Sequence, residues 1–175
     1  MAGKPLGELS TTQDTPHAES PWRAWRAAAG RPEVDAALRE LWEQLEARVR
    51  ARGPVCVASG KCCQFERYGH RLYITGLEIA WLLAQLPPDQ SAAGHARLTP
   101  SGGCPFQSAL LCGVHPIRPL GCRVFFCQKD AQDWQHQVYE EFLAALRRLH
   151  ERFDLPYRYM EWRGGLAEAY SDQPV

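Results

Sequence analysis

Residues 32–52, PEVDAALRELWEQLEARVRAR, decide the fold class of this chain. Apolar side chains recur there at the three- and four-residue spacing of one helical face: Val34, Leu38, Leu41, Leu45 and Val49. Pro32 suits the first turn of a helix, and the following Gly53-Pro54 pair ends it. The stretch therefore predicts a long amphipathic helix.

The sequence on either side predicts further helices. Ser20 can cap a short helix that begins at Pro21 and ends at Gly30. Thr75, with Glu78 three residues later, forms a capping box for the apolar run that follows. Residues 133–152 place their apolar side chains on one helical face and their acidic ones on the other. Helices therefore dominate the expected fold.

Residues 65–75 are the β-biased part, because Leu72 and Ile74 alternate with polar neighbours. We expect a loop over 89–103 and, at the C-terminus, a short element over 157–170. Pro and Gly residues exclude a long helix from 104–127.

The predicted fold is mainly α with minor β. It is a small single domain over residues 21–175, whose helices pack around irregular cysteine-bearing, metal-binding loops, with one short β-hairpin. The polar segment 1–20 is expected to be a disordered tail.

Charge and composition exclude some classes of function. The 175 residues hold 20 basic and 20 acidic side chains, so the formal net charge is zero, and no basic arm with interleaved aromatics is present. We therefore expect no nucleic-acid partner. The charge is uneven, because residues 61–129 hold 7 basic and 3 acidic side chains. That segment also carries six of the seven cysteines.

The compartment decides how the cysteines are interpreted. The N-terminus has no apolar stretch of the secretory type, and the longest strongly apolar run, Ile79–Ala84, is too short to span a bilayer. We expect a cytoplasmic protein with no membrane partner. Disulfides are rare in that compartment, so clustered cysteines indicate metal binding or redox chemistry. All seven are candidate metal ligands: Cys56, Cys62, Cys63, Cys104, Cys112, Cys122 and Cys127.

Three spaced motifs carry a family resemblance. GKCC at 60–63, CPF at 104–106 and C-x-V-H-x-x-R-P-x-x-C-R at 112–123 resemble the CxxCxxCC zinc- or iron-chelating domain family, the YkgJ-type cysteine cluster proteins. The resemblance covers about residues 56–127. Ser59 stands where the family has its second cysteine, and His115 where it usually has tyrosine.

The resemblance implies a metal or iron–sulfur site in a family whose biochemical role is mostly unassigned. Some proteins with similar cysteine domains are linked to lysine methylation of flagellin. Nothing outside the cysteine motif supports that activity here.

Seven thiolates are too few for two independent four-cysteine sites, so one site is expected, and a second would need His70 or His115. The favoured ligand set spans both cysteine groups: Cys56, Cys62 or Cys63, Cys104, Cys112 and Cys122. Only one of Cys62 and Cys63 is expected to reach the metal, because neighbouring side chains in extended chain diverge. Cys127 can instead be part of the core.

The sequence allows two kinds of metal site, an iron–sulfur centre or zinc. No CxxC knuckle of the kind structural zinc uses is present, and widely spaced ligands suit a larger cluster, so a 4Fe–4S centre is favoured with zinc as the alternative. Arg118 and Arg123 are candidate cofactor-binding residues that donate to the sulfurs from outside the ligand set. The competing interpretation is a salt bridge from each to the acidic C-terminal helix. Glu66 and Glu78 are candidate polar groups beside the site.

The leading hypothesis is a cysteine-cluster metal-binding protein with one iron–sulfur centre and a redox or modifying role. The alternatives are a structural zinc module that binds a protein partner, and metal chelation or delivery. No nucleotide-binding, metalloprotease or hydrolase motif is present, so the sequence assigns no enzyme class.

Overall fold

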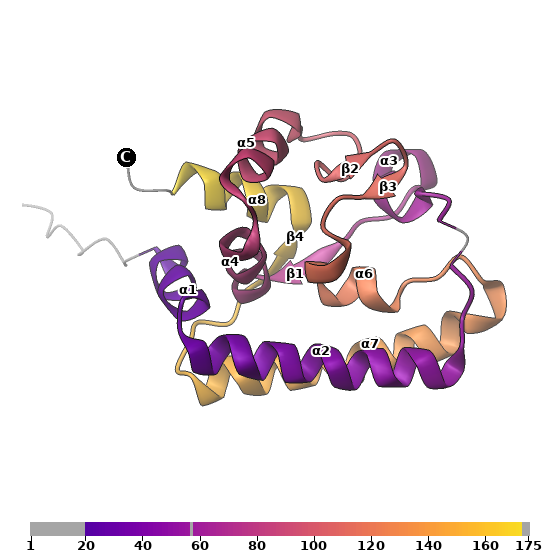
Figure 1. The fold of residues 1–175 in the computed structure, drawn as a ribbon, viewed down its shortest axis with the longest axis horizontal. Coiled ribbons are helices and arrows are strands. Elements are labelled where there is room, and N and C mark those ends of the chain that lie inside the picture. Colours follow the sequence, from indigo (N-terminus) through magenta and orange to yellow (C-terminus); the bar gives the residue numbers. More distant parts are fainter. Residues whose placement is uncertain (1–19, 57, 173–175) are drawn as a thin grey trace, which may run out of the picture.

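The computed structural model describes residues 20–56 and 58–172. Its base is a pair of long helices, α2 (Pro32–Arg52) and α7 (Gln132–Arg152), which contact each other and run in opposite directions (Figure 1). The predicted disordered tail lies outside the described residues except for Ser20. Within those residues, no helix is both long enough and apolar enough to cross a membrane.

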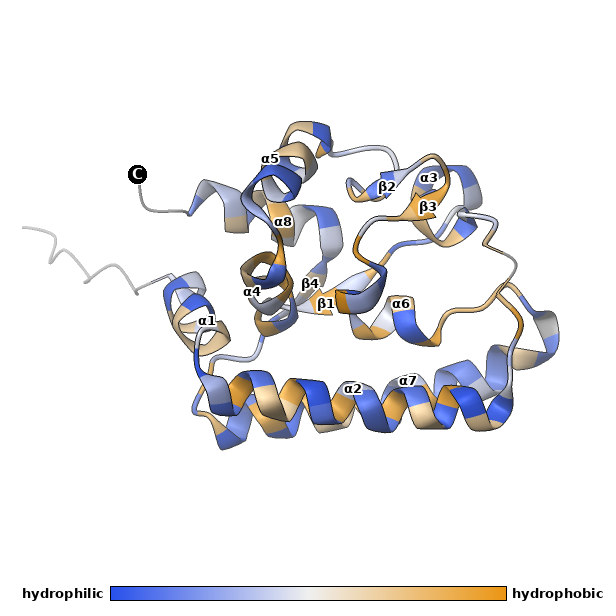
Figure 2. Ribbon diagram, viewed as in Figure 1, coloured by the Kyte–Doolittle hydropathy of each residue, from blue (hydrophilic) through white to orange (hydrophobic). Residues whose placement is uncertain are grey.

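Both base helices bury one face, as their periodicity predicts. Leu38 and Leu45 of α2 and Val138 and Leu146 of α7 are fully buried. Figure 2 shows apolar and polar residues interleaved along the two helices, the pattern of a helix with one side in the core. Burial of the apolar surface on these faces is the main favourable contribution to the free energy of folding.

A second group of helices lies above one end of the base in Figure 1. It contains α1 (Pro21–Ala29), α4 (Gly76–Gln85), α5 (Pro88–Arg97) and α8 (Trp162–Ser171). Helix α4 contacts α1 and α8, and α5 contacts α8. A Cβ at Gly76 would lie 2.4 Å from the buried Trp25 ring, so glycine lets α1 approach α4 closely. The predicted caps of Ser20 on α1 and of Thr75 with Glu78 on α4 are confirmed.

Two short antiparallel strand pairs complete the regular structure. Strand β1 (Tyr73–Thr75) pairs with β4 (Tyr159–Glu161), with Ile74 opposite Met160. Strand β2 (Gln107–Ser108) and β3 (Leu111–Cys112) form a hairpin inside the cysteine-bearing segment. The mainly α fold with minor β is therefore confirmed.

The loops that carry the cysteines contain only short elements. These are η1 (Lys61–Cys63), α3 (Phe65–Tyr68), η2 (His115–Ile117), α6 (Leu120–Val124) and η3 (Lys129–Ala131). In Figure 1, α6 lies above the middle of the base and α3 above its other end. Irregular chain with fixed turns is therefore what positions the thiols.

Two predictions of local structure are wrong. The β-biased stretch begins with the one-turn helix α3, which ends at Gly69 with φ +65°, and only residues 73–75 form a strand. Part of the expected loop over 89–103 is helix α5. Gly94 in that helix is a packing residue, because a Cβ there would lie 2.4 Å from the buried Phe106 ring. Tertiary packing overrides local propensity in both segments.

Candidate metal centre

Three thiols lie close to that of Cys63. Its buried sulfur is within hydrogen-bonding reach of the sulfurs of Cys104, Cys112 and Cys62. The Cys122 thiol is close enough to feel the charge of the same three cysteines. We refer to these five residues (Cys62, Cys63, Cys104, Cys112 and Cys122) as the thiol cluster. They come from η1, the loop before β2, strand β3 and helix α6.

Backbone contacts bring the first two segments of the thiol cluster together. The Cys104 N–H donates to the Cys63 carbonyl over 2.6 Å. A Cβ on the preceding residue, Gly103, would lie only 2.6 Å from that same carbonyl oxygen. The glycine at 103 therefore allows residues 104–106 to approach η1, the CC turn that carries Cys62 and Cys63.

The CC turn is also tied to the hairpin. The Gln107 side-chain amide donates to the Gly60 carbonyl over 2.9 Å. Gly60 has φ +67°, and a Cβ there would meet both Gln107 and the Leu110 carbonyl at 2.6 Å. This backbone conformation favours glycine, because a Cβ is crowded at positive φ. Gly60 therefore fixes where η1 begins and which way its two cysteines face.

The expectation that neighbouring cysteines diverge is wrong in its premise. Cys62 and Cys63 lie in the 3-10 helix η1, not in extended chain. Their thiols lie close enough for each to shift the pKa of the other, and both belong to the thiol cluster. A tight turn rotates successive side chains by about 120° rather than 180°, so both can face the same side.

The hairpin that carries Cys112 has an unusual turn. Its two central residues, Ala109 and Leu110, have φ +48° and +67°. Two-residue hairpin turns of this mirror-image type normally use asparagine and glycine, because side chains with a Cβ are strained at positive φ. The turn places Cys112 opposite Gln107, its cross-strand partner, and close to Cys63.

The pKa values of the clustered thiols are shifted in opposite directions. A hydrogen bond with Cys63 lowers the pKa of Cys62 to about 6 and that of Cys112 to about 7, with help from the Arg118 charge. A hydrogen bond with Cys63 also lowers the pKa of Cys104. The pKa of Cys63 is raised by hydrogen bonds with its neighbours, and that of Cys122 by burial. Gathering the thiols therefore favours thiolates at some positions and opposes them at others. A bound cation would relieve the repulsion that remains.

Hydrogen-bond donors surround the thiol cluster. The backbone N–H groups of Phe106 and Val114 donate to Cys104 and Cys112. The buried indole N–H of Trp162 has no hydrogen-bond partner of ordinary geometry among the described residues. It nevertheless lies close enough to Cys104 to lower the pKa of that thiol. Donors that face sulfur suit a thiolate-ligated metal or iron–sulfur group, because they stabilise its negative sulfurs.

The charge of Arg118 acts on three thiols of the cluster. Its charge lowers the pKa of Cys62 and of Cys112 and acts in the same direction on Cys122. Its Nε is buried without a partner among the described residues, while one terminal nitrogen contacts the exposed His115 ring. The role of Arg118 as a donor to the sulfurs stays a prediction.

Arg123 has a different role. It is only 2% exposed, and its guanidinium donates to Glu46 of α2 over 2.7 Å. It also donates to the carbonyls of Arg118 and Pro116, over 2.7 and 2.9 Å. Arg123 therefore anchors the loop before Cys122 to α2 and is not paired with the C-terminal helix. Nothing in the sequence pattern indicated Glu46 as its partner.

The two candidate carboxylates also anchor loops. Glu78 is buried and accepts from the Leu120 N–H over 2.9 Å, which joins the start of α6 to the start of α4. Its burial raises its pKa. Glu66 accepts from the buried Arg163 over 2.9 Å, and Arg163 donates in turn to the Gly102 carbonyl over 3.0 Å. The capping pattern predicted only the first part of the role of Glu78.

Cys56 and Cys127 lie outside the thiol cluster. Both are exposed, and the Cys127 sulfur lies 3.9 Å from the Ser59 hydroxyl. Within residues 20–56 and 58–172, no group of three or more histidine, cysteine, aspartate or glutamate side chains is arranged to hold a metal ion. The thiol cluster is thus a set of neighbouring thiols without a closed coordination shell. Which cysteines are ligands stays a prediction.

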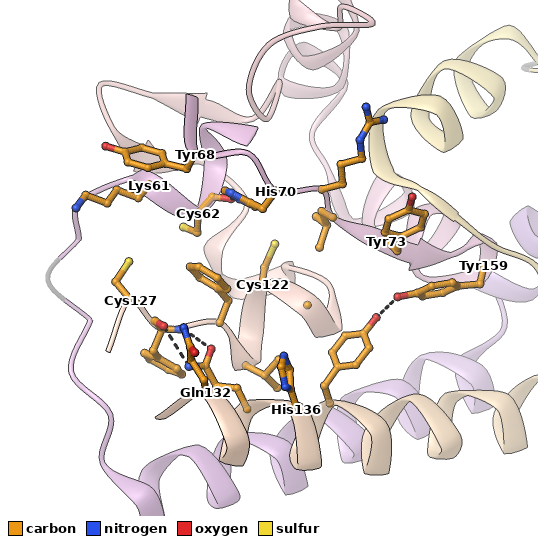
Figure 3. Close-up of a pocket in the computed structure, with 18 residues that line it drawn as sticks. Lys61, Cys62, Tyr68, His70, Tyr73, Cys122, Cys127, Gln132, His136 and Tyr159 are labelled. Atoms are coloured by element: carbon orange, nitrogen blue, oxygen red, sulfur yellow. Dashed lines mark hydrogen bonds between the residues drawn. The ribbon is translucent and has the colours of Figure 1, made fainter. Parts of the chain in front are cut away.

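A cavity of about 700 Å³ opens beside the thiol cluster (Figure 3). Cys62 and Cys122 line it, and Cys127 lies at its edge in the view of Figure 3. The Cys122 thiol points from α6 toward the segment that carries Cys62 and His70. His70 is held there by its ring nitrogen, 3.2 Å from the Cys62 carbonyl.

Comparison of the chain with protein-family models, curated protein sequences and solved structures finds no match. The resemblance to the CxxCxxCC family therefore stays a prediction from the motifs.

Proposed function

We propose that this protein is a cysteine-cluster metalloprotein that holds one 4Fe–4S centre within the thiol cluster and has a redox or modifying role. The observation that carries the proposal is the convergence of five thiols from four separate segments, with Trp162 and Arg118 donors beside them. Such a gathering of thiols has no advantage for a hydrophobic core. It is the donor set that iron–sulfur groups use.

Four of the five thiols would hold the centre. Cys62, Cys104 and Cys112 have pKa values lowered by their neighbours, and each accepts a backbone N–H, which suits metal-bound thiolates. The fourth ligand would be Cys63 or Cys122. When bound, such a centre supplies one-electron chemistry, and the N–H donors around the sulfurs would set its potential.

The cytoplasm is the compartment that fits this proposal. All seven cysteines are free in the structure, although several thiols of the cluster lie within hydrogen-bonding reach of one another. A reducing environment keeps neighbouring thiols from pairing as disulfides. We therefore propose a cytoplasmic location.

Metal analysis of the full chain tests the proposal. Protein purified without oxygen should be brown and contain about four iron and four sulfide per chain. Colourless protein with one zinc per chain would overturn the iron–sulfur assignment and leave the structural zinc module in its place. Metal-free protein that takes up neither metal on reconstitution would overturn the metal site itself.

Serine variants then assign the ligands. Cys104→Ser and Cys112→Ser should lose the metal, whereas Cys56→Ser and Cys127→Ser serve as controls and should keep it, because they alter exposed thiols outside the cluster. Comparison of Cys63→Ser with Cys122→Ser identifies the fourth ligand. Loss of metal from the two controls, with retention in Cys104→Ser, would place the site elsewhere.

A further inference from the structure

The cavity beside the thiol cluster is walled by aromatic rings. At one end, the rings of Tyr73 and Tyr159 stack with their centroids 5.5 Å apart, and the Tyr159 hydroxyl hydrogen-bonds to that of Tyr139. At the other end, the His70 and Phe125 rings stack at 5.7 Å with an interplanar angle of 11°. Both ends therefore offer flat π surfaces, held in place by contacts with their neighbours.

These rings are exposed although they are large. Tyr73, Tyr159 and Phe125 are 43%, 39% and 42% exposed. All three residues line the cavity, which at about 700 Å³ lies within the range of small-molecule sites. Apolar surface that a protein keeps open in a cavity of this size is typical of a ligand site rather than of a core.

The charge of the lining limits the ligand. None of the described side chains that line the cavity is an aspartate or a glutamate, whereas Lys61, Arg71, His70 and His136 all contribute to it. Lys61 lies at the rim with its ammonium turned outward (Figure 3), so it acts on the mouth of the cavity. A cationic ligand would meet the like charges of Lys61 and Arg71, and no carboxylate of the described lining would bind it, while the Cys62 thiolate is a ligand of the proposed centre.

We propose that the cavity binds a planar aromatic molecule that carries no positive charge, stacked between the two aromatic ends and lying against Cys62 and Cys122. The contact with these two cysteines makes this molecule the substrate or electron partner of the centre. That assignment rests on the proposed function. Binding in the cavity needs only the aromatic walls and the charge of the lining.

Four naphthalene or cyclohexane probes test the ligand class by calorimetric titration of the full chain. Naphthalene-2-sulfonate and 2-naphthol should bind, and naphthalen-2-ylmethylammonium should bind at least about 10-fold more weakly. Cyclohexanesulfonate, which lacks a π face, should bind about 3- to 10-fold more weakly than the naphthalene anion. Tighter binding of the ammonium probe would overturn the charge assignment, and no preference for the aromatic ring would overturn the stacking.

Variants locate the binding. His136 lies on α7 and lines the cavity (Figure 3). His136→Trp should fill the cavity and weaken naphthalene-2-sulfonate binding by about 10-fold or more. Gln137→Trp, one residue further along α7 and outside the lining, is the matched control and should bind as the unaltered chain does. Equal binding by the two tryptophan variants would refute the site.

A second variant guards against misfolding. Tyr159→Leu keeps the apolar bulk and removes the stacking face, so it should weaken binding about 3- to 10-fold while the circular dichroism spectrum stays the same. Unchanged affinity would contradict the stacked geometry. These measurements need no bound metal, so loss of probe binding and loss of the metal centre are separate results. In metal-loaded protein, the probe should also perturb the visible spectrum of the centre.

Discussion

Arg123 offers the sharpest test of how the cysteine-bearing loop is held. The guanidinium is almost fully buried and donates to Glu46 and to the carbonyls of Arg118 and Pro116. It also lies over the Trp42 ring, 4.8 Å from its centroid. Burial lowers the pKa of Arg123 to about 10, so it is still charged at neutral pH. Replacement by methionine keeps much of the volume and removes every one of these hydrogen bonds.

The size of the effect follows from which partners are left behind. Glu46 is 45% exposed and regains water when Arg123 is removed, so loss of this ion pair lowers the free energy of unfolding only slightly. The two carbonyls lose a charged donor, at about 1.5 kcal/mol or more each. We therefore expect Arg123→Met to lower the free energy of unfolding by about 3 kcal/mol.

Urea denaturation of Arg123→Met measures this, and Arg50→Met is the matched control. Arg50 pairs with the same Glu46, but over 3.8 Å and with 71% of its side chain exposed, so its loss should cost about 0.5 kcal/mol or less. With a slope of about 2 kcal/mol per molar urea, the Arg123→Met midpoint should fall by about 1.5 M. Equal shifts in the two variants would refute the anchoring role of Arg123.

Two other changes test the loop further. The buried Glu78 carboxyl has a raised pKa, so the native state holds its proton more readily than the unfolded state does. Its contribution to stability is present below its ordinary pKa of 4.5 and is lost as the pH rises through the folded pKa. The stability of the unaltered chain relative to Glu78→Gln should therefore fall as the pH rises above about 4.5 in urea denaturation, and a constant or rising difference would contradict this. In the hairpin, Ala109→Asn with Leu110→Gly supplies residues suited to positive φ and should raise stability by about 1 kcal/mol. A lower thermal midpoint would show that the turn is not strained.

The periodic and capped elements were predictable from the sequence because their signals are local. The two base helices follow from the three- and four-residue spacing of their apolar residues, and the start of α4 follows from Thr75 and Glu78. Helix α5 was missed because Gly94 and its polar neighbours are typical of a loop. The reason for that glycine is the Phe106 ring, which is distant in sequence.

The candidate site was predictable in its residue types and not in its arrangement. The motifs indicated the cysteines and Arg118, but the mutual contacts of Cys62 and Cys63 depend on the 3-10 turn after Gly60. The Trp162 indole beside Cys104 comes from the far end of the chain and has no local signal. Long-range contacts of single side chains leave no periodic pattern, so sequence reasoning cannot find them.

The contacts around the cysteine-bearing loops explain how irregular chain can hold thiols close to one another. One buried arginine, Arg123, ties the segment before Cys122 to α2 through Glu46. Another, Arg163 of α8, holds the Gly102 carbonyl just before Cys104 and pairs with Glu66 just after the CC turn. Arg123 donates to two loop carbonyls and Arg163 to one, and a carbonyl that is buried without a donor costs free energy.

Because these anchors are attached to large helices with their own buried core, we expect the domain to fold before a metal binds, unlike a small zinc finger. The loops would then hold the thiols near one another in advance. Metal binding would need only small movements of side chains to close the coordination shell, at a low cost in conformational entropy.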